Sequence, residues 1–315
     1  KRRMWYAISG VLMVICILSI AIRGFTFGID FEGGTQVSMP ARGAVTTSEV
    51  TKVFEDTLGR SPDTVQQAGA GSSATIQIRT STLTGPETAE LLHALGTAFE
   101  PDVKPADVSS SDVSSTWGKE ITQKMLIALA VFLVVAFIYI AIRFDKEMSV
   151  AAMASLVFDL VVTAGIYSLV GWEMTPATVI GLLTILGFSI YDTVVVFDKV
   201  EENTRGVLAT RRRTYAEQTN LAVNQTFMRS INTTVISILP IISLMIVAVW
   251  MLGVGTLKDL ALVQLVGIVV GMFSSIYLAS PLLVTLKERR PEVKAHTQKV
   301  LARRRRAAEA AGARA

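Results

Sequence analysis

The sequence predicts a membrane α-helical protein, with six transmembrane helices and one small α+β domain between the first two helices. Hydrophobic residues make up 51% of the 315 residues, and the mean hydropathy is +0.49. This composition is too apolar for a soluble protein of this length. Six apolar runs are each long enough to cross a bilayer. The segment after the first run instead alternates strand-like and helix-like patterns.

The six apolar runs cover residues 4–22, 125–142, 148–170, 174–197, 231–254 and 260–286. The first run follows three basic residues, as in a signal peptide, but its apolar core is too long and Ala21-Ile22-Arg23 is a poor cleavage site. We therefore expect an uncleaved anchor. In the fourth run, Thr175 can cap a helix and Pro176 suits the first helical position.

Basic residues near the ends of the runs fall almost entirely on the side that holds both termini. Because cytoplasmic loops carry an excess of Lys and Arg, we expect a multi-pass protein of the cell inner membrane with both termini in the cytoplasm. The expected parts are a first helix (1–27), an extracytoplasmic domain (28–120), helices two to six (121–286, with a cytoplasmic connection at 200–228) and a basic tail (287–315).

We interpret the basic tail as a solvated segment, with contact to membrane lipid or to the ribosome as the alternative. Topology and the tail account for the net charge of +4, so this charge does not indicate nucleic-acid binding.

Residues 35–114 show four strand patterns and two helix patterns in the order β-α-β-β-α-β, which is typical of a ferredoxin-like domain. The strands are expected at 35–39, 64–67, 74–80 and 107–114, and the helices at 47–58 and 84–99. Thr47 or Ser48 is the expected cap of the first helix. Thr84 and Glu87 have the spacing of a capping box at the second.

The segment between the first run and this domain contains Gly28, Asp30, Gly33 and Gly34. One interpretation is a turn that leaves the membrane, in which the glycines supply unusual backbone angles. The other is a fixed hinge that orients the small domain. A metal site is not expected, because no further ligand cluster lies nearby in the sequence.

Two carboxylates fall inside predicted membrane helices, Asp159 in the third run and Asp192 in the fourth. An Asp at the centre of a membrane helix costs roughly 2.5 to 3.5 kcal/mol, so such residues normally face protein or water. Asp192 is therefore a candidate for an ion path or a buried pair. Asp159 is either an interhelical hydrogen-bonding group or a second member of a polar path.

Arg229, at the start of the fifth run, is the expected counter-charge of Asp192, because the two can lie at similar depth on adjacent helices. The alternative is that Arg229 extends to the membrane interface. Desolvation favours the protonated form of Asp192 and Arg229 favours the ionised form. A helix shift that opens or closes this contact would therefore change the proton affinity of Asp192.

Gly267, Gly271 and Ser275 place small residues at every fourth position of the sixth run, which allows close helix packing. His93 and His296 lie outside the runs, so no histidine relay is expected. The sequence contains no apparent nucleophile and base pair or metal-ligand set, and we expect neither an enzyme nor a cofactor.

Four segments resemble the SecF family of protein-export membrane subunits, within the resistance-nodulation-division superfamily. They are residues 28–35, 187–203, 224–230 and 274–277, and the resemblance extends over nearly the whole chain. It implies a subunit that pairs with SecD beside the SecYEG channel and uses the proton motive force to pull on an unfolded polypeptide after SecA has pushed it. It also implies that Asp192 and Arg229 belong to the proton path, with Asp159 as a lesser candidate.

Three features depart from the family pattern: Tyr191 replaces the usual Asn, Phe158 replaces a frequent His, and residues 115–117 replace a Gly-Pro approach to the second helix. The first two weaken the case for a proton route through positions 191 and 158. The alternatives to protein export are half of a proton-driven lipid or small-molecule exporter, and a scaffold in which the buried charges are structural. A single small outer domain argues against the exporter.

Overall fold

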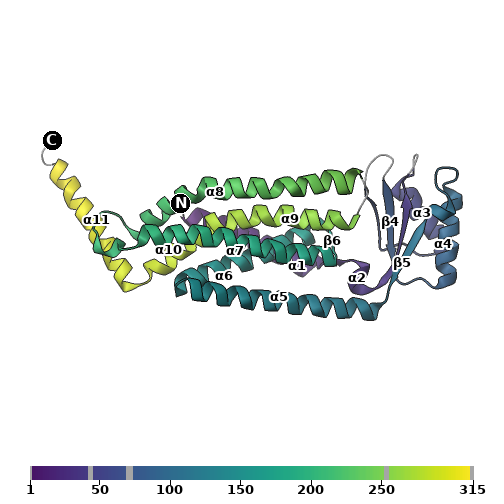
Figure 1. The fold of residues 1–315 in the computed structure, drawn as a ribbon, viewed down its shortest axis with the longest axis horizontal. Coiled ribbons are helices and arrows are strands. Elements are labelled where there is room, and N and C mark those ends of the chain that lie inside the picture. Colours follow the sequence, from purple (N-terminus) through teal and green to yellow (C-terminus); the bar gives the residue numbers. More distant parts are fainter. Residues whose placement is uncertain (1, 42–44, 69–73, 252–254, 313–315) are drawn as a thin grey trace.

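The computed structural model describes residues 2–41, 45–68, 74–251 and 255–312 as an elongated helix bundle with a small sheet domain at one end (Figure 1). In these residues six helical spans are long and apolar enough to cross a membrane, as the sequence predicts. They are built from α1 (Arg2–Arg23), α5 (Ser115–Arg143), α6 (Lys146–Val170), α7 (Pro176–Thr204), α8 (Tyr215–Leu244) and α9 (Gly255–Ser274). The π-helical segment η4 (Met245–Met251) extends α8. A second one, η5 (Ser275–Ala279), joins α9 to α10 (Ser280–Glu288).

The spans containing α6, α7 and α9 form the centre of the bundle. In each of these three spans, 44–56% of the residues in the most apolar 18-residue stretch are buried, against 11–17% in the spans of α1, α5 and α8. The outer three therefore present long rows of exposed apolar side chains, which a lipid bilayer or another membrane chain would cover.

The segment between α7 and α8 is more helical than expected. Thr175 caps α7 in a capping box with Thr178, and Pro176 is its first residue, as predicted. The helix then continues past the apolar run to Thr204, and α8 already begins at Tyr215. Only residues 205–214, with the short 3-10 turn η3 (Val207–Ala209), separate the two helices. Most of the predicted connection at 200–228 is therefore helix.

The sheet domain has the predicted order of elements. They are β2 (Gly34–Pro40), α3 (Thr47–Leu58), β3 (Thr64–Ala68), β4 (Thr75–Thr80), α4 (Gly85–Ala98), the 3-10 turn η2 (Pro105–Asp107) and β5 (Ser109–Val113). The strands pair antiparallel in the order β3-β4-β2-β5, which is the ferredoxin-like order. Val37, Phe54, Ile76 and Leu91 are fully buried in its core.

The capping of the two helices in this domain agrees with the sequence at one helix and differs at the other. Thr84 and Glu87 form the predicted capping box at α4. At α3 the cap is Thr46, because Glu49 lies three residues after it and closes the box. The expectation that Thr47 or Ser48 caps this helix is therefore wrong.

Short elements join the sheet domain to the bundle. β1 (Thr26–Phe27) pairs in parallel with β6 (Glu173–Met174), which lies just before α7. The one-turn helix α2 (Ile29–Glu32) follows β1 and was not expected. Gly33 and Gly34 have φ values of 82° and 136°. A Cβ on Gly34 would lie 2.5 Å from the carbonyl oxygen of Thr80, so glycine is required here both by its backbone angle and by this close approach.

The basic tail is a helix, α11 (Pro291–Gly312), which projects from the end of the bundle away from the sheet domain (Figure 1). Arg304 pairs with Glu217 at the start of α8 at 2.5 Å, and His296 contacts the carbonyl oxygen of Thr210 at 2.6 Å.

Near the same end of the bundle, burial would raise the pKa of Asp145, but a hydrogen bond from Lys287 holds that pKa below its usual range.

Candidate functional site

Asp192 lies on α7 with its carboxylate buried inside the bundle, and only 5% of the residue is exposed. Ser230 on α8 donates a hydrogen bond to its Oδ1 at 2.7 Å. Oδ2 is also buried, and within the described part of the chain it has no hydrogen-bond partner. Because a buried carboxylate anion is costly unless it is paired and hydrogen-bonded, Oδ2 is a position where a proton or a counter-charge would be favoured.

Asp159 lies on α6 and is also buried. Ser189 on α7 donates a hydrogen bond to its Oδ2, while its Oδ1 has no hydrogen-bond partner among the residues described. Nearby, Ser155 on α6 donates to Ser274 on α9 at 3.3 Å. Asp159 is therefore an interhelical hydrogen-bonding group. Its place on a polar path remains a prediction.

Ser189, Asp192 and Thr193 share one face of α7, since residues three and four positions apart are neighbours on a helix. Ser189 bonds to α6 and Asp192 bonds to α8. Thr193 shares a hydrogen bond of 2.9 Å with Ser275 in η5. This face of α7 thus joins buried polar groups of three neighbouring helical segments.

The π-helical turn η5 interrupts the helix formed by α9 and α10 beside this face. Ser275 is fully buried there, and its carbonyl oxygen accepts a hydrogen bond of 3.2 Å from the Ser280 hydroxyl. π-helical turns are rare and occur often at functional sites, because they re-aim side chains within a helix. In this chain the turn begins at the serine that bonds to Thr193.

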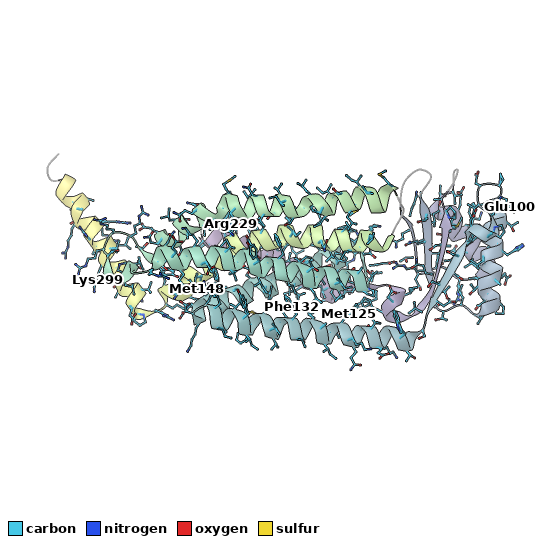
Figure 2. The ribbon with its side chains drawn as sticks, in the orientation of Figure 1. Glu100, Met125, Phe132, Met148, Arg229 and Lys299 are labelled. Atoms are coloured by element: carbon cyan, nitrogen blue, oxygen red, sulfur yellow. The ribbon has the colours of Figure 1, made fainter. Side chains whose placement is uncertain are left out.

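Arg229 does not form the ion pair with Asp192 that the sequence led us to expect. Arg229 lies on α8 (Figure 2) and its side chain is exposed. Its Nη2 donates a hydrogen bond of 3.3 Å to the hydroxyl of Tyr191. Consecutive residues of a helix point about 100° apart. Since Ser230 is turned toward Asp192, Arg229 is turned toward the surface. The guanidinium still interacts electrostatically with Asp192 without direct contact.

Gly267 and Gly271 lie where α9 packs against α7. A Cβ on Gly267 would lie 2.3 Å from Cδ1 of Ile185, and a Cβ on Gly271 would lie 3.2 Å from Cβ of Ser189. The absence of side chains at these two positions lets α9 lie close to the face of α7 that carries Ser189.

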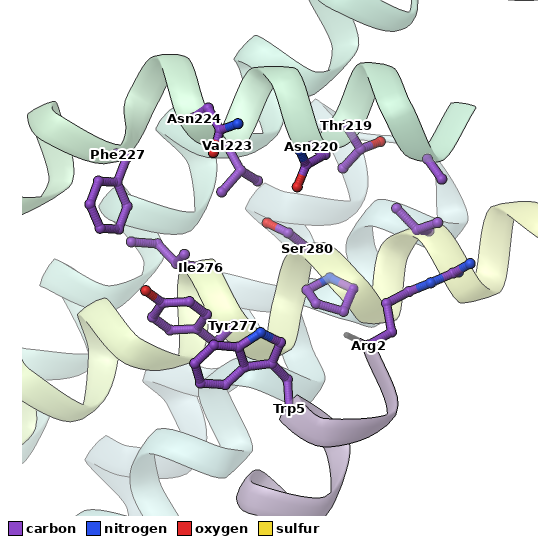
Figure 3. A pocket seen from close by; sticks show the side chains of 13 residues that line it. Arg2, Trp5, Thr219, Asn220, Val223, Asn224, Phe227, Ile276, Tyr277 and Ser280 are labelled. Carbon is purple, nitrogen blue, oxygen red and sulfur yellow. The ribbon is translucent and has the colours of Figure 1, made fainter. Parts of the chain in front are cut away.

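A cavity of about 470 Å³ lies between α1, α8 and the segment formed by η5 and α10, at the end of the bundle away from the sheet domain. Figure 3 shows Trp5 and Tyr277 together on one wall. Their rings are stacked, with the ring centroids 4.0 Å apart. Asn220 and Asn224 of α8 line the other wall. Residues two positions apart in η5 thus face different surroundings, since Tyr277 lines this cavity while Ser275 bonds to α7.

The chain matches two described protein families. Residues 94–289 match "Protein export membrane protein SecD/SecF, C-terminal", and residues 18–45 match the "SecD/SecF GG Motif". The first match covers more than half of the chain. This chain belongs to the SecD/SecF family.

Individual relatives of the SecD/SecF family agree with this assignment. The chain is 58% identical over 315 residues to protein translocase subunit SecF of Mycobacterium leprae (strain TN), covering 96% of this chain and 67% of that protein. It is 59% identical over 309 residues to the same subunit of Mycobacterium tuberculosis (strain ATCC 25618 / H37Rv), covering 96% and 70%.

Among solved structures of the SecD/SecF family, the fold is similar to a crystal structure of SecDF from Thermus thermophilus, described as a translocon-associated membrane protein. The TM-score is 0.79 at 31% identity. The match covers 91% of this chain but only 38% of that SecDF chain.

Each of the two family matches contains a different set of the residues predicted from the sequence. The GG-motif match contains Gly28, Asp30, Gly33 and Gly34, so the junction between α1 and the sheet domain is a family feature. The C-terminal match contains Asp159, Asp192 and Arg229.

Sequence reasoning missed Ser189 and Ser230 as hydrogen-bond donors to the two carboxylates. Ser189 lies three residues before Asp192, and this spacing indicates a shared helix face. No local pattern links Ser189 to Asp159, because that contact depends on how α6 packs against α7.

Proposed function

We propose that this chain is the SecF-type accessory subunit of the Sec protein translocase, which couples the proton motive force to the export of polypeptides. The observation that carries the proposal is the pair of buried carboxylates, Asp159 and Asp192, each held by a serine of a neighbouring helix and each with one unpaired oxygen. Buried ionisable groups in membrane helices mark ion and proton paths. In this proposal the subunit has an accessory role in export.

Asp192 is the proton carrier in this proposal. In the arrangement seen here its Oδ2 is unpaired and Arg229 is bonded to Tyr191. A displacement of α8 that brings Arg229 into contact with Asp192 would stabilise the anion and release the proton. One proton that crosses a potential of 100 mV contributes about 2.3 kcal/mol. Since about 1.4 kcal/mol changes an equilibrium constant tenfold, this shifts the equilibrium between two states roughly 40-fold. Several protons for each exported chain are therefore expected.

SecD is the proposed partner, because the similar Thermus thermophilus SecDF chain is much longer than this one. The surface around Arg229 supports such a partner. Tyr191 is 52% exposed, and Met228, next to Arg229 on α8, is 60% exposed. An exposed guanidinium on a membrane helix is costly against lipid, so a protein partner is favoured here. The SecYEG channel, SecA and the unfolded polypeptide are the further proposed partners.

The proposed location is the cytoplasmic membrane, with the sheet domain outside the cell membrane and both termini in the cytoplasm. The distribution of basic residues supports this orientation, since Arg143, Arg205 and α11 all lie at the bundle end opposite the sheet domain. The small sheet domain and the names of the relatives favour polypeptide export over lipid or small-molecule export.

The test is Asp192→Asn in a strain that lacks the native copy. Asparagine keeps the shape of the side chain but cannot ionise, so we expect the proton-motive-force-dependent part of export to be lost. Asp198→Asn is the matched control, because Asp198 lies on the same helix but its side chain is 44% exposed and pairs with Arg143. Undiminished export by a correctly assembled Asp192→Asn complex would refute the proposal.

A further inference from the structure

Arg79 is a buried cation at the junction between the sheet domain and the bundle. It lies on β4, and only 7% of the residue is exposed. Its guanidinium pairs with Glu173 of β6, which is equally shielded from solvent. The second carboxylate oxygen of Glu173 accepts a hydrogen bond of 2.8 Å from Thr64 on β3. Two strands of the sheet domain therefore hold one carboxylate of the bundle.

Two further carboxylates interact electrostatically with the same guanidinium. Burial lowers the pKa of Arg79, and the nearby charges of Asp259 and Asp30 oppose that shift. Asp259 lies in the first turns of α9 and is 9% exposed, and Asp30 lies in α2. We call Arg79, Glu173, Asp259 and Asp30 the junction cluster. Its one cation comes from the sheet domain, and its three carboxylates come from β6, α9 and α2.

The backbone beside the junction cluster is also tightly fitted. The N–H of Gly28 donates to the carbonyl oxygen of Met174 at 2.9 Å, next to the parallel pairing of β1 with β6. A Cβ on Gly28 would lie 3.2 Å from Nη1 of Arg79 and 3.3 Å from Cγ2 of Thr175. Gly28 therefore leaves the space through which Arg79 reaches Glu173.

The junction cluster lies at the starts of α7 and α9, two of the helices that contribute to the buried polar site. Glu173 comes just before Thr175, the cap of α7. Asp192 lies 16 residues after Pro176, or about 24 Å along α7 at 1.5 Å per residue. Ser275 lies 16 residues after Asp259, or about 24 Å along the helix of α9. The same two helices therefore have one end at the junction cluster and the polar site farther along.

Close packing makes α7 and α9 a single mechanical unit. Besides the contacts of Gly267 and Gly271, a Cβ on Gly181 of α7 would lie 2.2 Å from Cγ1 of Val263 on α9. These contacts are spread along the shared length of the two helices, and tightly packed elements transmit displacement because they are not continuously deformable. A shift of α7 or α9 at the depth of Asp192 therefore also displaces the helix ends at the junction cluster.

We propose that Arg79 is the positioning residue through which displacement of α7 and α9 reaches the sheet domain, by holding Glu173 at the start of α7. This inference rests on the proposed proton-coupled function. It adds that the sheet domain is driven through one ion pair, and that a chain lacking this pair still exchanges protons but does not convert them into export.

The test is the double variant Arg79→Met and Glu173→Met. Replacing both members of a buried ion pair with apolar side chains avoids leaving one charge unpaired, so the protein is expected to fold and assemble. Proton uptake by the purified complex with its partner should persist, while the proton-motive-force-dependent part of export is lost. A purely structural role of the pair would change both quantities together or neither. The matched control is Glu120→Met with Lys124→Met, an exposed ion pair near the start of α5, which should retain both quantities.

The inference would be overturned if the Arg79→Met and Glu173→Met double variant kept all of its proton-motive-force-dependent export. It would also be overturned if the double variant lost proton uptake and export equally. If this double variant does not accumulate, Arg79→Cys with Glu173→Cys is used instead. Cys16→Ser is added, because Cys16 is the one cysteine of the sequence. A short, reducible bifunctional thiol reagent should restore export, and its reduction should remove it. Equal export in both states would overturn the inference. Asp192→Asn in the same assay tests the proposed function separately, since it should abolish proton uptake as well.

Discussion

Gly34 provides a quantitative test of the junction, because two separate costs apply to any side chain there. Its φ of 136° is unfavourable for residues other than glycine, which costs about 1–3 kcal/mol. A Cβ would also lie 2.5 Å from the carbonyl oxygen of Thr80, and relieving such overpacking costs about 1–3 kcal/mol more. Gly59 shares only the first cost, since its φ is 65° and a Cβ there would contact nothing within 4 Å.

The assay is hydrogen exchange of the amides in β2 and β4, measured on the full chain in nanodiscs. Exchange through opening of the sheet domain reports the free energy of that opening. Gly34→Ala should speed exchange more than Gly59→Ala, by the additional 1–3 kcal/mol, which is roughly 5- to 150-fold. Gly85→Ala, at an open position with ordinary backbone angles, should change exchange little. Equal exchange in Gly34→Ala and Gly59→Ala would refute the close approach to Thr80.

Three other predictions concern the bundle. Gly271→Leu should separate α9 from α7, destabilise the chain by about 1–3 kcal/mol and abolish force-dependent export, as measured by thermal unfolding and an export assay. Lys287→Met should cost about 1 kcal/mol, because the partner Asp145 is about two-fifths exposed and screened by solvent. Folding lowers the pKa of Asp145. The stabilisation by Lys287 is therefore present above about pH 4 and is lost as the pH falls through the pKa of Asp145 in the folded protein. The unfolding temperature of the parent chain should fall over this pH range, and that of Lys287→Met should change less. Tyr191→Phe should retain export and Arg229→Gln should not, because the tyrosine only holds the guanidinium in the open arrangement.

Each of these predictions has a control or a result that contradicts it. Gly10→Leu on α1 should be tolerated, since a Cβ there contacts nothing within 4 Å. An unfolding temperature of Lys287→Met that follows pH as the parent chain does would show that the contact with Asp145 contributes no stability. Export as impaired in Tyr191→Phe as in Arg229→Gln would mean that the tyrosine hydroxyl takes part in the proton path.

Local patterns in the sequence predicted the six membrane spans and the main elements of the sheet domain, but not the short elements β1, α2 and β6 or the helix within 200–228. The apolar runs identify the six spans because crossing a bilayer imposes a length and a composition, and the cap at Thr175 follows from local chemistry. The order of the sheet domain follows from alternating patterns in the same way. The predicted cap, Thr47 or Ser48, lies one or two residues after the observed cap Thr46, since three consecutive hydroxyl residues compete for the cap and only the distance to Glu49 decides between them.

The contacts of the candidate site depend on how helices are rotated, which local patterns do not determine. Apolar length sets the depth of Arg229, but its direction depends on which face of α8 packs against α7, and Ser230 occupies that face. The pairing of Arg79 with Glu173 joins residues that are far apart in the sequence, so no spacing rule could indicate it. The π-helical turn at Ser275 likewise arises from packing.

Difference infrared spectroscopy of the carboxyl C=O band tests directly whether Asp192 gains and loses a proton. The complex with its partner chain would be compared before and after a change of pH across the membrane, for the parent chain, Asp192→Asn and Asp159→Asn. Proton transfer at Asp192 predicts a protonated-carboxyl signal that changes in the parent chain and in Asp159→Asn but is missing in Asp192→Asn. The same signal, unchanged in Asp192→Asn, would contradict the proposed role of this carboxylate.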